Sequence, residues 1–327
     1  MMKSIFKIDP SKVECINSIY QMSDMPDKVL DSEDDCYIGY EEIGEGYSGI
    51  TRLTLPPDAV ECSKLIAEYV KDGILLDLAC GDGAYTVPCA KLGMKVIGGD
   101  ISNKMMSLLI ERAEKNNVSL DKVMLCRMNA LDIPINDESI DCVIANSVLH
   151  LISHPEKVVD EIYRVLKKDG VFICFDDAPG RGAYGGNQYY DAAGEIYRRY
   201  WEYLGKIGIK EKKYSWKFDR NGYCETEFNK EERLISWNHE HVEKVEDIFL
   251  PRLSSRGFSA QTTVPEKEHK EALQYALEAA DKRFGEGWRK YSVSFTISEY
   301  CVRSSTIMDV TIIIIVSRRI TFKIMEN

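Results

Sequence analysis

"LLDLACGDGAYT", residues 75–86, is the stretch that decides the fold of this chain. An apolar run ends at Asp77, and glycines follow at Gly81 and Gly83. Because glycine has no Cβ, such a turn can bend tightly and let another molecule approach the backbone closely. The turn also precedes a predicted helix, whose first N–H groups have no partner within the helix. The stretch therefore predicts a ligand-binding turn at the carboxyl end of a buried strand.

Apolar strands and amphipathic helices alternate through this part of the chain, which is typical of a parallel sheet covered by helices on both faces. We expect an α/β fold with a doubly wound, Rossmann-like, mostly parallel seven-stranded sheet and an added helical and aromatic cap. The predicted strands are 74–79, 95–100, 122–129, 139–146, 171–177, 232–240 and 290–302, and the predicted helices are 56–73, 85–93, 102–117, 154–170, 241–255 and 265–283.

Changes in this pattern predict how the chain is divided. The tail contains the apolar, β-branched run "VTIIIIVSRRITFKI", residues 310–324, which is shorter than the roughly 20 apolar residues of a membrane-spanning helix. It is either an added strand or a segment foreign to the domain. The expected units are an N-terminal lid at 1–55, a core at 56–175, a substrate cap at 176–231, the completion of the sheet at 232–304 and the apolar tail at 305–327.

The composition favours a reduced, acidic protein. The net charge of −11 over 327 residues opposes binding to phosphate backbones. The ten cysteines form neither a Cys-x-x-Cys pair nor a metal-like pattern with histidine, so no metal site is expected. The opening "MMKSIFKIDP" lacks the apolar segment of a secretory leader. We therefore expect a cytoplasmic protein whose partner is a small molecule, with no nucleic acid or membrane partner.

The residues of the turn discriminate between two classes of ligand. A dinucleotide site follows the pattern G-x-G-x-x-G, in which the pyrophosphate lies on the helix N-terminus. Here Thr86 stands at the third glycine position, and Asp77 and Asp82 would place carboxylates beside the pyrophosphate. The same carboxylates would favour a ligand that carries an ammonium or sulfonium group.

At these positions the chain resembles the class I S-adenosylmethionine-dependent methyltransferases, and it is similar to the ubiquinone/menaquinone-type domain among their small-molecule members. Their glycine motif is an acid followed by three glycines at alternate positions. It corresponds here to Asp77, Ala79, Gly81 and Gly83, and Cys80 lies between Ala79 and Gly81. Alanine replaces the first glycine. We expect a negative φ at Ala79, because a positive φ would strain an alanine.

The acid at the end of the second strand supports this resemblance. Asp100 follows Asp77 by 23 residues, close to the spacing at which an acid binds ribose hydroxyls, and its carboxylate can accept from both of them. The resemblance further implies a set of residues that bind S-adenosylmethionine. These are Ile101 and Met105 beside the adenine, Asn129, Ala130 and Leu131 of the segment "MNALDIPI", and Asn146 and Ser147 after the fourth strand.

The predicted reaction is transfer of the sulfonium methyl group to a small molecule by in-line displacement. The leaving group is already good, so alignment supplies much of the rate, and a general base is optional. No catalytic residue is assigned. The candidates for the acceptor pocket are His150, Asp176, Tyr184 and Tyr47, the last of which lies in the glycine-flanked "GYSG" that could move as a lid.

Two alternatives stay open from the sequence. A protein of this fold could bind S-adenosylmethionine without turnover, as a regulator or scaffold. A nicotinamide-dependent oxidoreductase would use a similar sheet, although Asp77 and the missing third glycine oppose that interpretation.

Overall fold

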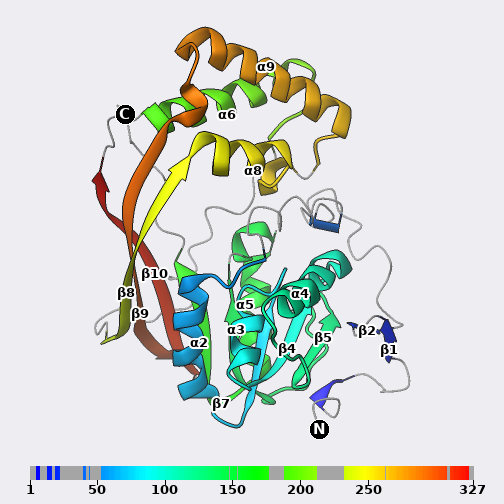
Figure 1. The fold of residues 1–327 in the computed structure, drawn as a ribbon. Helices are drawn as coiled ribbons and strands as arrows, with labels where there is room; N and C mark the ends of the chain where they lie inside the picture. Colours follow the sequence, from blue (N-terminus) through cyan, green and yellow to red (C-terminus); the bar gives the residue numbers. More distant parts are fainter. Residues whose placement is uncertain are drawn as a thin grey trace.

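The computed structural model describes residues 5–7, 13–16, 19–22, 40–41, 44, 53–146, 148–152, 154–176, 188–211, 232–261, 263–307 and 310–323. Over these residues the chain forms one mixed sheet with helices on both faces and a separate helical layer (Figure 1). The confirmed prediction is the α/β, Rossmann-like, mostly parallel sheet. The expected seven strands are too few, because ten strands pair within the described part of the chain.

The strand order places the glycine turn at the centre of the sheet. The order is β1-β2-β5-β4-β3-β6-β7-β10-β9-β8, and the seven strands from β2 to β10 run parallel. The chain order reverses at β3, and ligands of open α/β sheets bind at such a switch point. The strands are β1 (Val13–Ile16), β2 (Ile19–Met22), β3 (Ile74–Leu78), β4 (Lys95–Asp100), β5 (Val123–Arg127), β6 (Ile140–Ala145), β7 (Leu166–Asp176), β8 (Glu232–Lys244), β9 (Ser292–Ile307) and β10 (Val310–Lys323).

Alternating side chains of the strands form two cores. Leu76, Ile97 and Phe172 pack on the face covered by α5 (Pro155–Val165). Leu75 and Val96 point to the opposite face. That face is covered by α2 (Pro57–Val70), α3 (Thr86–Lys91) and α4 (Asn103–Lys115). A strand buried on both faces must be apolar at nearly every position, as "ILLDL" in β3 is apart from Asp77.

The predicted cap of α4 and the predicted end of α5 have opposite outcomes. Ser102 caps α4 as expected, since its hydroxyl oxygen accepts the Met105 N–H at 3.1 Å. The predicted end of α5 at Gly170 is wrong. The helix ends at Val165, and β7 begins at once because Leu166 pairs with Ile140 of β6.

The apolar tail is an interior strand of the sheet. Thr311 to Val316 of β10 pair in parallel with 171–176 of β7, and the other edge of β10 pairs with β9. Of the two interpretations of this tail, the pairing supports the added strand. The predicted helix at 241–255 is wrong over its first residues, because strand β8 continues through them. Lys244 still pairs with Ser292 of β9, so only the five-residue π-helix Val245–Phe249 and α8 (Leu250–Ser254) remain helical.

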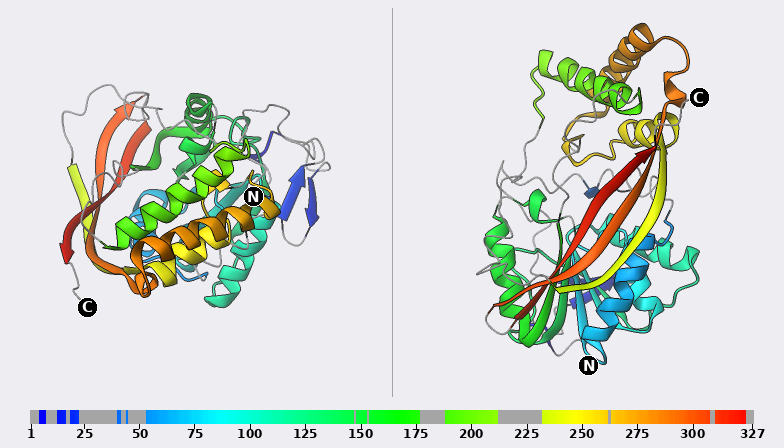
Figure 2. Two further views of the ribbon diagram at one scale, coloured as in Figure 1. Left: turned by 90° about the horizontal axis from the view of Figure 1, so that it is seen from above. Right: turned by 90° about the vertical axis from the view of Figure 1, so that its left-hand side faces the viewer.

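A helical layer lies beyond the carboxyl ends of the parallel strands (Figure 1). It consists of α6 (Gln188–Lys206), α8 and α9 (Glu266–Phe284), and Figure 2 shows α6 and α9 side by side, with the arm of β8, β9 and β10 leading up to them. The layer has its own core, in which Tyr200 and Trp288 are fully buried. It therefore lies on the same side of the sheet as the glycine turn.

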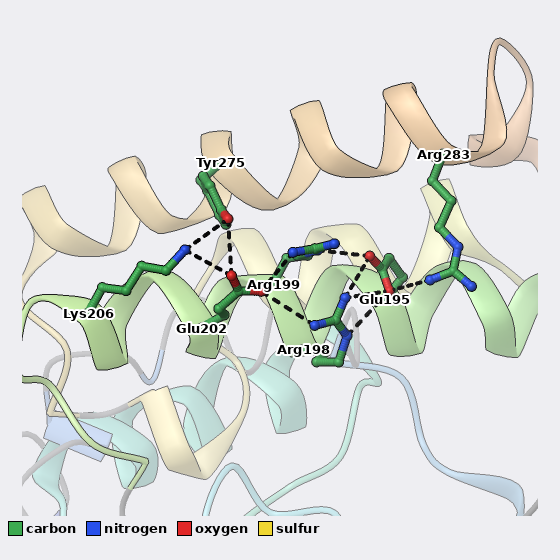
Figure 3. Close-up of polar contacts among 7 residues, drawn as sticks. All are labelled: Glu195, Arg198, Arg199, Glu202, Lys206, Tyr275 and Arg283. Atoms are coloured by element: carbon green, nitrogen blue, oxygen red, sulfur yellow. Dashed lines mark hydrogen bonds and ion pairs between the residues drawn. The ribbon is translucent and has the colours of Figure 1, made fainter.

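Two glutamates of α6 anchor an ion-pair network in this layer (Figure 3). The buried Glu195 accepts from Arg198 and Arg199 of its own helix and from Arg283 of α9 at 2.6 Å. Glu202 pairs with Arg199 and with Lys206. Because Arg283 comes from the neighbouring helix, the network fixes α6 against α9.

A neutral histidine in the same layer predicts acid sensitivity. His269 of α9 is buried between Tyr200 and the Ser254 carbonyl oxygen, with Nε2 2.9 Å from that oxygen and Nδ1 2.9 Å from the Tyr200 hydroxyl. A carbonyl oxygen only accepts, so Nε2 carries the proton and Nδ1 accepts from Tyr200. Burial above all lowers the pKa of His269 below its ordinary value. As the pH falls, the unfolded chain therefore binds a proton at His269 before the folded protein does. The stability that the neutral His269 contributes is lost as pH falls below about 6.5.

We expect the free energy of unfolding, measured in urea at pH 8 and pH 5, to fall more with acid in the wild type than in His269→Gln. A loss of equal size in the two proteins would contradict this account of His269.

Candidate cofactor site

The turn after β3 winds through three left-handed residues. Their φ angles are 58° at Ala79, 54° at Gly81 and 80° at Gly83. Two backbone hydrogen bonds hold the turn. The Cys80 N–H donates to the Gly99 oxygen of β4 at 3.0 Å, and the Gly83 N–H donates to the Cys80 oxygen within the turn at 2.9 Å. Ala79 and Gly81 stay half-buried, whereas Cys80, Asp82 and Gly83 are buried. Ala79 and Gly81 thus keep part of their surface accessible at the carboxyl edge of the sheet.

The expected negative φ at Ala79 is wrong. The residue follows the same left-handed path as the glycines, so its Cβ crowds its own carbonyl oxygen at a cost of about 1–2 kcal/mol. Strain of this kind persists only where the surrounding structure holds it.

We expect Ala79→Gly to stabilise the protein by about 1 kcal/mol, because glycine adopts this conformation without strain. The comparison variant is Ala90→Gly in the last turn of α3, which should lose up to about 1 kcal/mol since glycine disfavours a helix. Urea unfolding measures both, and destabilisation by Ala79→Gly would contradict the strain.

Asp77 ties the two ends of the turn together. Its Oδ2 accepts the Thr86 hydroxyl at 2.5 Å, and Thr86 is the first residue of α3. The carboxyl is buried, and burial raises its pKa to about 7, with a smaller contribution from the charge of Asp100. In the sequence Thr86 is notable only because it stands at the third glycine position. In the structure it is the hydrogen-bond partner of Asp77.

The structure corrects the electrostatic role given to Asp82. Its Oδ2 lies 2.6 Å from Arg112 Nη2, and both side chains are buried. The guanidinium neutralises this carboxylate, so Asp82 offers no attraction to a cationic ligand. Of the two acids in the turn, only Asp77 could contribute such a field.

Asp100 holds the centre of the site. One carboxylate oxygen accepts the Gly81 N–H and the other accepts the Ser102 N–H, each at 2.8 Å. Burial raises its pKa to about 6, although the backbone N–H groups of Ser102, Gly81 and Ile101 oppose this shift. Each oxygen keeps a further lone pair, so the ionised side chain can still accept from two hydroxyl groups.

The N-terminal segment reaches the same place, which sequence reasoning missed. Glu41 accepts the Ser102 hydroxyl at 2.5 Å and the Lys104 N–H at 3.2 Å, so its carboxylate lies at the positive end of α4. Its charge also raises the pKa of Asp100. The only signal in the sequence is the acidic pair in "YEEIGEGYSG", which has no spacing relation to α4.

The remaining predicted residues line the same edge at the ends of neighbouring strands. Ile101 follows β4 directly, and Met105 is buried in the first turn of α4. Asn129 follows β5, where its Oδ1 accepts the Leu131 N–H at 2.9 Å, and Ala130 packs with Leu131 against the core. Asn146 follows β6 and is half-buried.

Some candidates cannot be placed by their side chains. Ser147, Tyr47 and Tyr184 lie outside the described residues. The backbone of His150 belongs to the short 3-10 helix Leu149–Leu151 after β6, and that of Asp176 ends β7. Within the described part of the chain, no cluster of three or more potential metal ligands occurs and no helix is long and apolar enough to span a bilayer.

One known protein family covers the part of the chain that contains this site. Residues 76–174 match the model of the "Methyltransferase domain" family. Demethylmenaquinone methyltransferase from Lactiplantibacillus plantarum is 34% identical over 105 residues, which are 31% of this chain and 44% of the relative. Ribosomal protein L11 methyltransferase from Dictyoglomus thermophilum is 35% identical over 119 residues, or 36% of this chain and 37% of the relative. The chain thus spans less than half the length of these two relatives.

Solved structures resemble the chain more loosely. The YcgJ protein from Bacillus subtilis is 17% identical with a TM-score of 0.39, and the match covers 75% of this chain and 94% of that one. A SAM-dependent methyltransferase from Aquifex aeolicus is 26% identical with a TM-score of 0.31, over 37% of this chain and 67% of that one.

Proposed function

We propose that this chain, whose residues 76–174 are a class I S-adenosylmethionine-dependent methyltransferase domain, transfers a methyl group from S-adenosylmethionine to a small-molecule acceptor. The observation that carries the proposal is the meeting of Asp100 with the Gly81 N–H at the switch point of the sheet. An acid and a glycine turn from adjacent strands are held there in one rigid arrangement.

The residues present fit a nucleoside with an amino-acid tail. The two oxygens of Asp100 retain lone pairs for the hydroxyls of a ribose. Ile101 and Met105 would border the adenine, and the half-buried backbone at Ala79 and Gly81 would contact the tail. A pyrophosphate would fit poorly, because Asp77 lies beside the turn as a buried acid and Thr86 replaces the third glycine of the dinucleotide pattern.

Asn129 has a more restricted role than the sequence implies. Its Oδ1 already accepts the Leu131 N–H, so the side chain is fixed in orientation. That oxygen has a second lone pair for an adenine amino group, while Nδ2 is available as a donor.

The chemistry required of the protein is alignment. S-adenosylmethionine, when bound, supplies an electrophilic methyl group on a sulfonium whose thioether leaves readily. The protein contributes by holding donor and acceptor in line, which can account for several kcal/mol of the barrier. A base for a hydroxyl acceptor would have to come from the carboxyl edge, and His150 and Asp176 are our candidates because their backbones follow β6 and end β7.

A small acceptor is supported by the helical layer and by the net charge. Helices α6, α8 and α9 lie beyond the edge at which the acceptor must enter (Figure 1). A net charge of −11 disfavours a nucleic acid there. The names of the two relatives point to different acceptors, demethylmenaquinone and ribosomal protein L11, so the acceptor itself is left to experiment.

The test is a screen of small acceptors for release of S-adenosylhomocysteine. We expect turnover with at least one hydroxyl, amine, thiol or carbon acceptor. Tight binding of S-adenosylmethionine without turnover on any acceptor would instead favour a regulator or scaffold that keeps the fold.

A further inference from the structure

A fully buried arginine of α4, Arg112, contacts the glycine turn at Asp82. Arg112 of α4 donates from Nε to the Asp82 carbonyl oxygen at 2.8 Å, and its Nη2 lies 2.6 Å from Asp82 Oδ2. Its Nη1 donates to the Thr54 carbonyl oxygen. One guanidinium thus binds three oxygens from two segments that are far apart in sequence.

Burying this charge is costly, so its geometry is informative. An ion pair removed from water is held only when hydrogen bonds satisfy the remaining donors and acceptors. The planar guanidinium offers donors in a fixed fork, which the flexible ammonium of lysine cannot reproduce. Three oxygens at the positions of Asp82 and Thr54 therefore require arginine in particular.

The same side of α4 supports the turn at further points. Gly83 lies so close to Leu109 that a Cβ on the glycine would be 2.4 Å from Leu109 Cγ. One turn beyond Arg112, Asn116 Nδ2 donates to the Leu53 carbonyl oxygen at 2.8 Å. Leu109, Arg112 and Asn116 thus join the glycine turn to residues 53–54.

The turn needs an outside restraint of this kind. Asp82 stands between Gly81 and Gly83, which both have positive φ, and Ala79 shares that strained conformation. The Gly81 N–H must also stay on Asp100. A turn with so many left-handed residues can relax to other conformations if nothing fixes its middle residue.

We propose that Arg112 is a positioning residue for the cofactor: it holds the turn at Asp82 so that the Gly81 N–H and the Asp100 carboxylate keep the arrangement that binds S-adenosylmethionine. This inference rests on the proposed function, because it concerns the same site. Because Arg112 is fully buried, it would act through the turn and not by contact with the cofactor or the acceptor.

The first test is Arg112→Lys, which keeps the buried charge and removes the fork. We expect the Kd for S-adenosylmethionine, measured by calorimetry, to rise at least tenfold. In turnover assays the KM for S-adenosylmethionine should rise by a similar factor, while the KM for the acceptor changes less than twofold. A purely structural role would not separate the two KM values.

A matched control is Arg164→Lys. Arg164 of α5 also binds two carbonyl oxygens, those of Ile133 and Ile135, and the carboxylates of Glu161 and Asp137. It lies in the last turn of α5, a helix that returns to the amino edge of the sheet, away from the glycine turn. We expect it to lower the Tm as Arg112→Lys does but to leave the Kd within twofold of wild type. Equal loss of binding in both variants would overturn the proposal.

A double variant separates folding from positioning should a single variant unfold. Asp82→Asn with Arg112→Met removes both buried charges, so its Tm should exceed that of Arg112→Met alone. Its Kd should stay at least tenfold above wild type. Wild-type affinity in the folded double variant would refute the role of Arg112, whereas a wild type that fails to bind S-adenosylmethionine would refute the proposed function itself.

Discussion

Gly83→Ala is expected to destabilise the protein by about 2–5 kcal/mol. The φ of +80° would place an alanine in a left-handed conformation that costs about 1–2 kcal/mol. Its Cβ would also lie 2.4 Å from Leu109 Cγ and 3.0 Å from Leu109 Cδ1, and overpacking of this kind adds about 1–3 kcal/mol. Urea unfolding at constant m-value measures the loss.

Gly93→Ala is the control for this variant. Gly93 also has a φ of +80°, but the nearest atom to its Cβ is Lys122 Nζ at 3.8 Å. It therefore shares the backbone strain and lacks the clash, so it should cost only about 1–2 kcal/mol. Equal losses for the two variants would show that Leu109 does not fix the turn.

Asp100→Asn is expected to weaken binding of S-adenosylmethionine at least 100-fold, or by about 2.7 kcal/mol. Both carboxylate oxygens accept backbone N–H groups, from Gly81 and Ser102, so an amide must turn its NH₂ toward one of them. The substitution therefore removes one hydrogen bond and places the amide NH₂ against a backbone N–H, so that two donors face each other. It also halves the number of acceptor oxygens left for the ribose hydroxyls.

The control for Asp100→Asn is Asp141→Asn. Asp141 on β6 also accepts a backbone N–H, that of Ile74 at 2.8 Å, but Ile74 begins β3 at the amino edge of the sheet. Its replacement should leave the Kd within twofold of wild type.

Binding of S-adenosylmethionine to the wild type should also weaken below about pH 6, because burial raises the pKa of Asp100 to about 6 and the carboxylate accepts fully only when ionised. An unchanged Kd in Asp100→Asn would contradict the assignment of this residue.

Local chemistry made much of the fold predictable from sequence. Buried β-strands, the Ser102 cap and the acid that ends β4 each depend on neighbours within a few residues. The five strands from β3 to β7 were accordingly found near their predicted positions, with ends displaced where tertiary pairing prevailed, as at Leu166.

The remainder depends on contacts between distant residues. Nothing within "DLACGDG" shows that Asp82 is neutralised, because Arg112 is 30 residues away and faces the turn only through the packing of α4. The sign of φ at Ala79 also could not be read from the residue type, which tolerates strain when its surroundings hold it. The place of β10 between β7 and β9 is likewise a property of the whole sheet.

The most direct test of the central claim is calorimetric titration of the full chain with S-adenosylmethionine and, separately, with NADH. The site predicts saturable binding of S-adenosylmethionine at one site per chain, with no saturable binding of NADH, since the buried acid Asp77 lies beside the turn that would bind a pyrophosphate and Thr86 stands at the third glycine position. Saturable binding of NADH without binding of S-adenosylmethionine would contradict it.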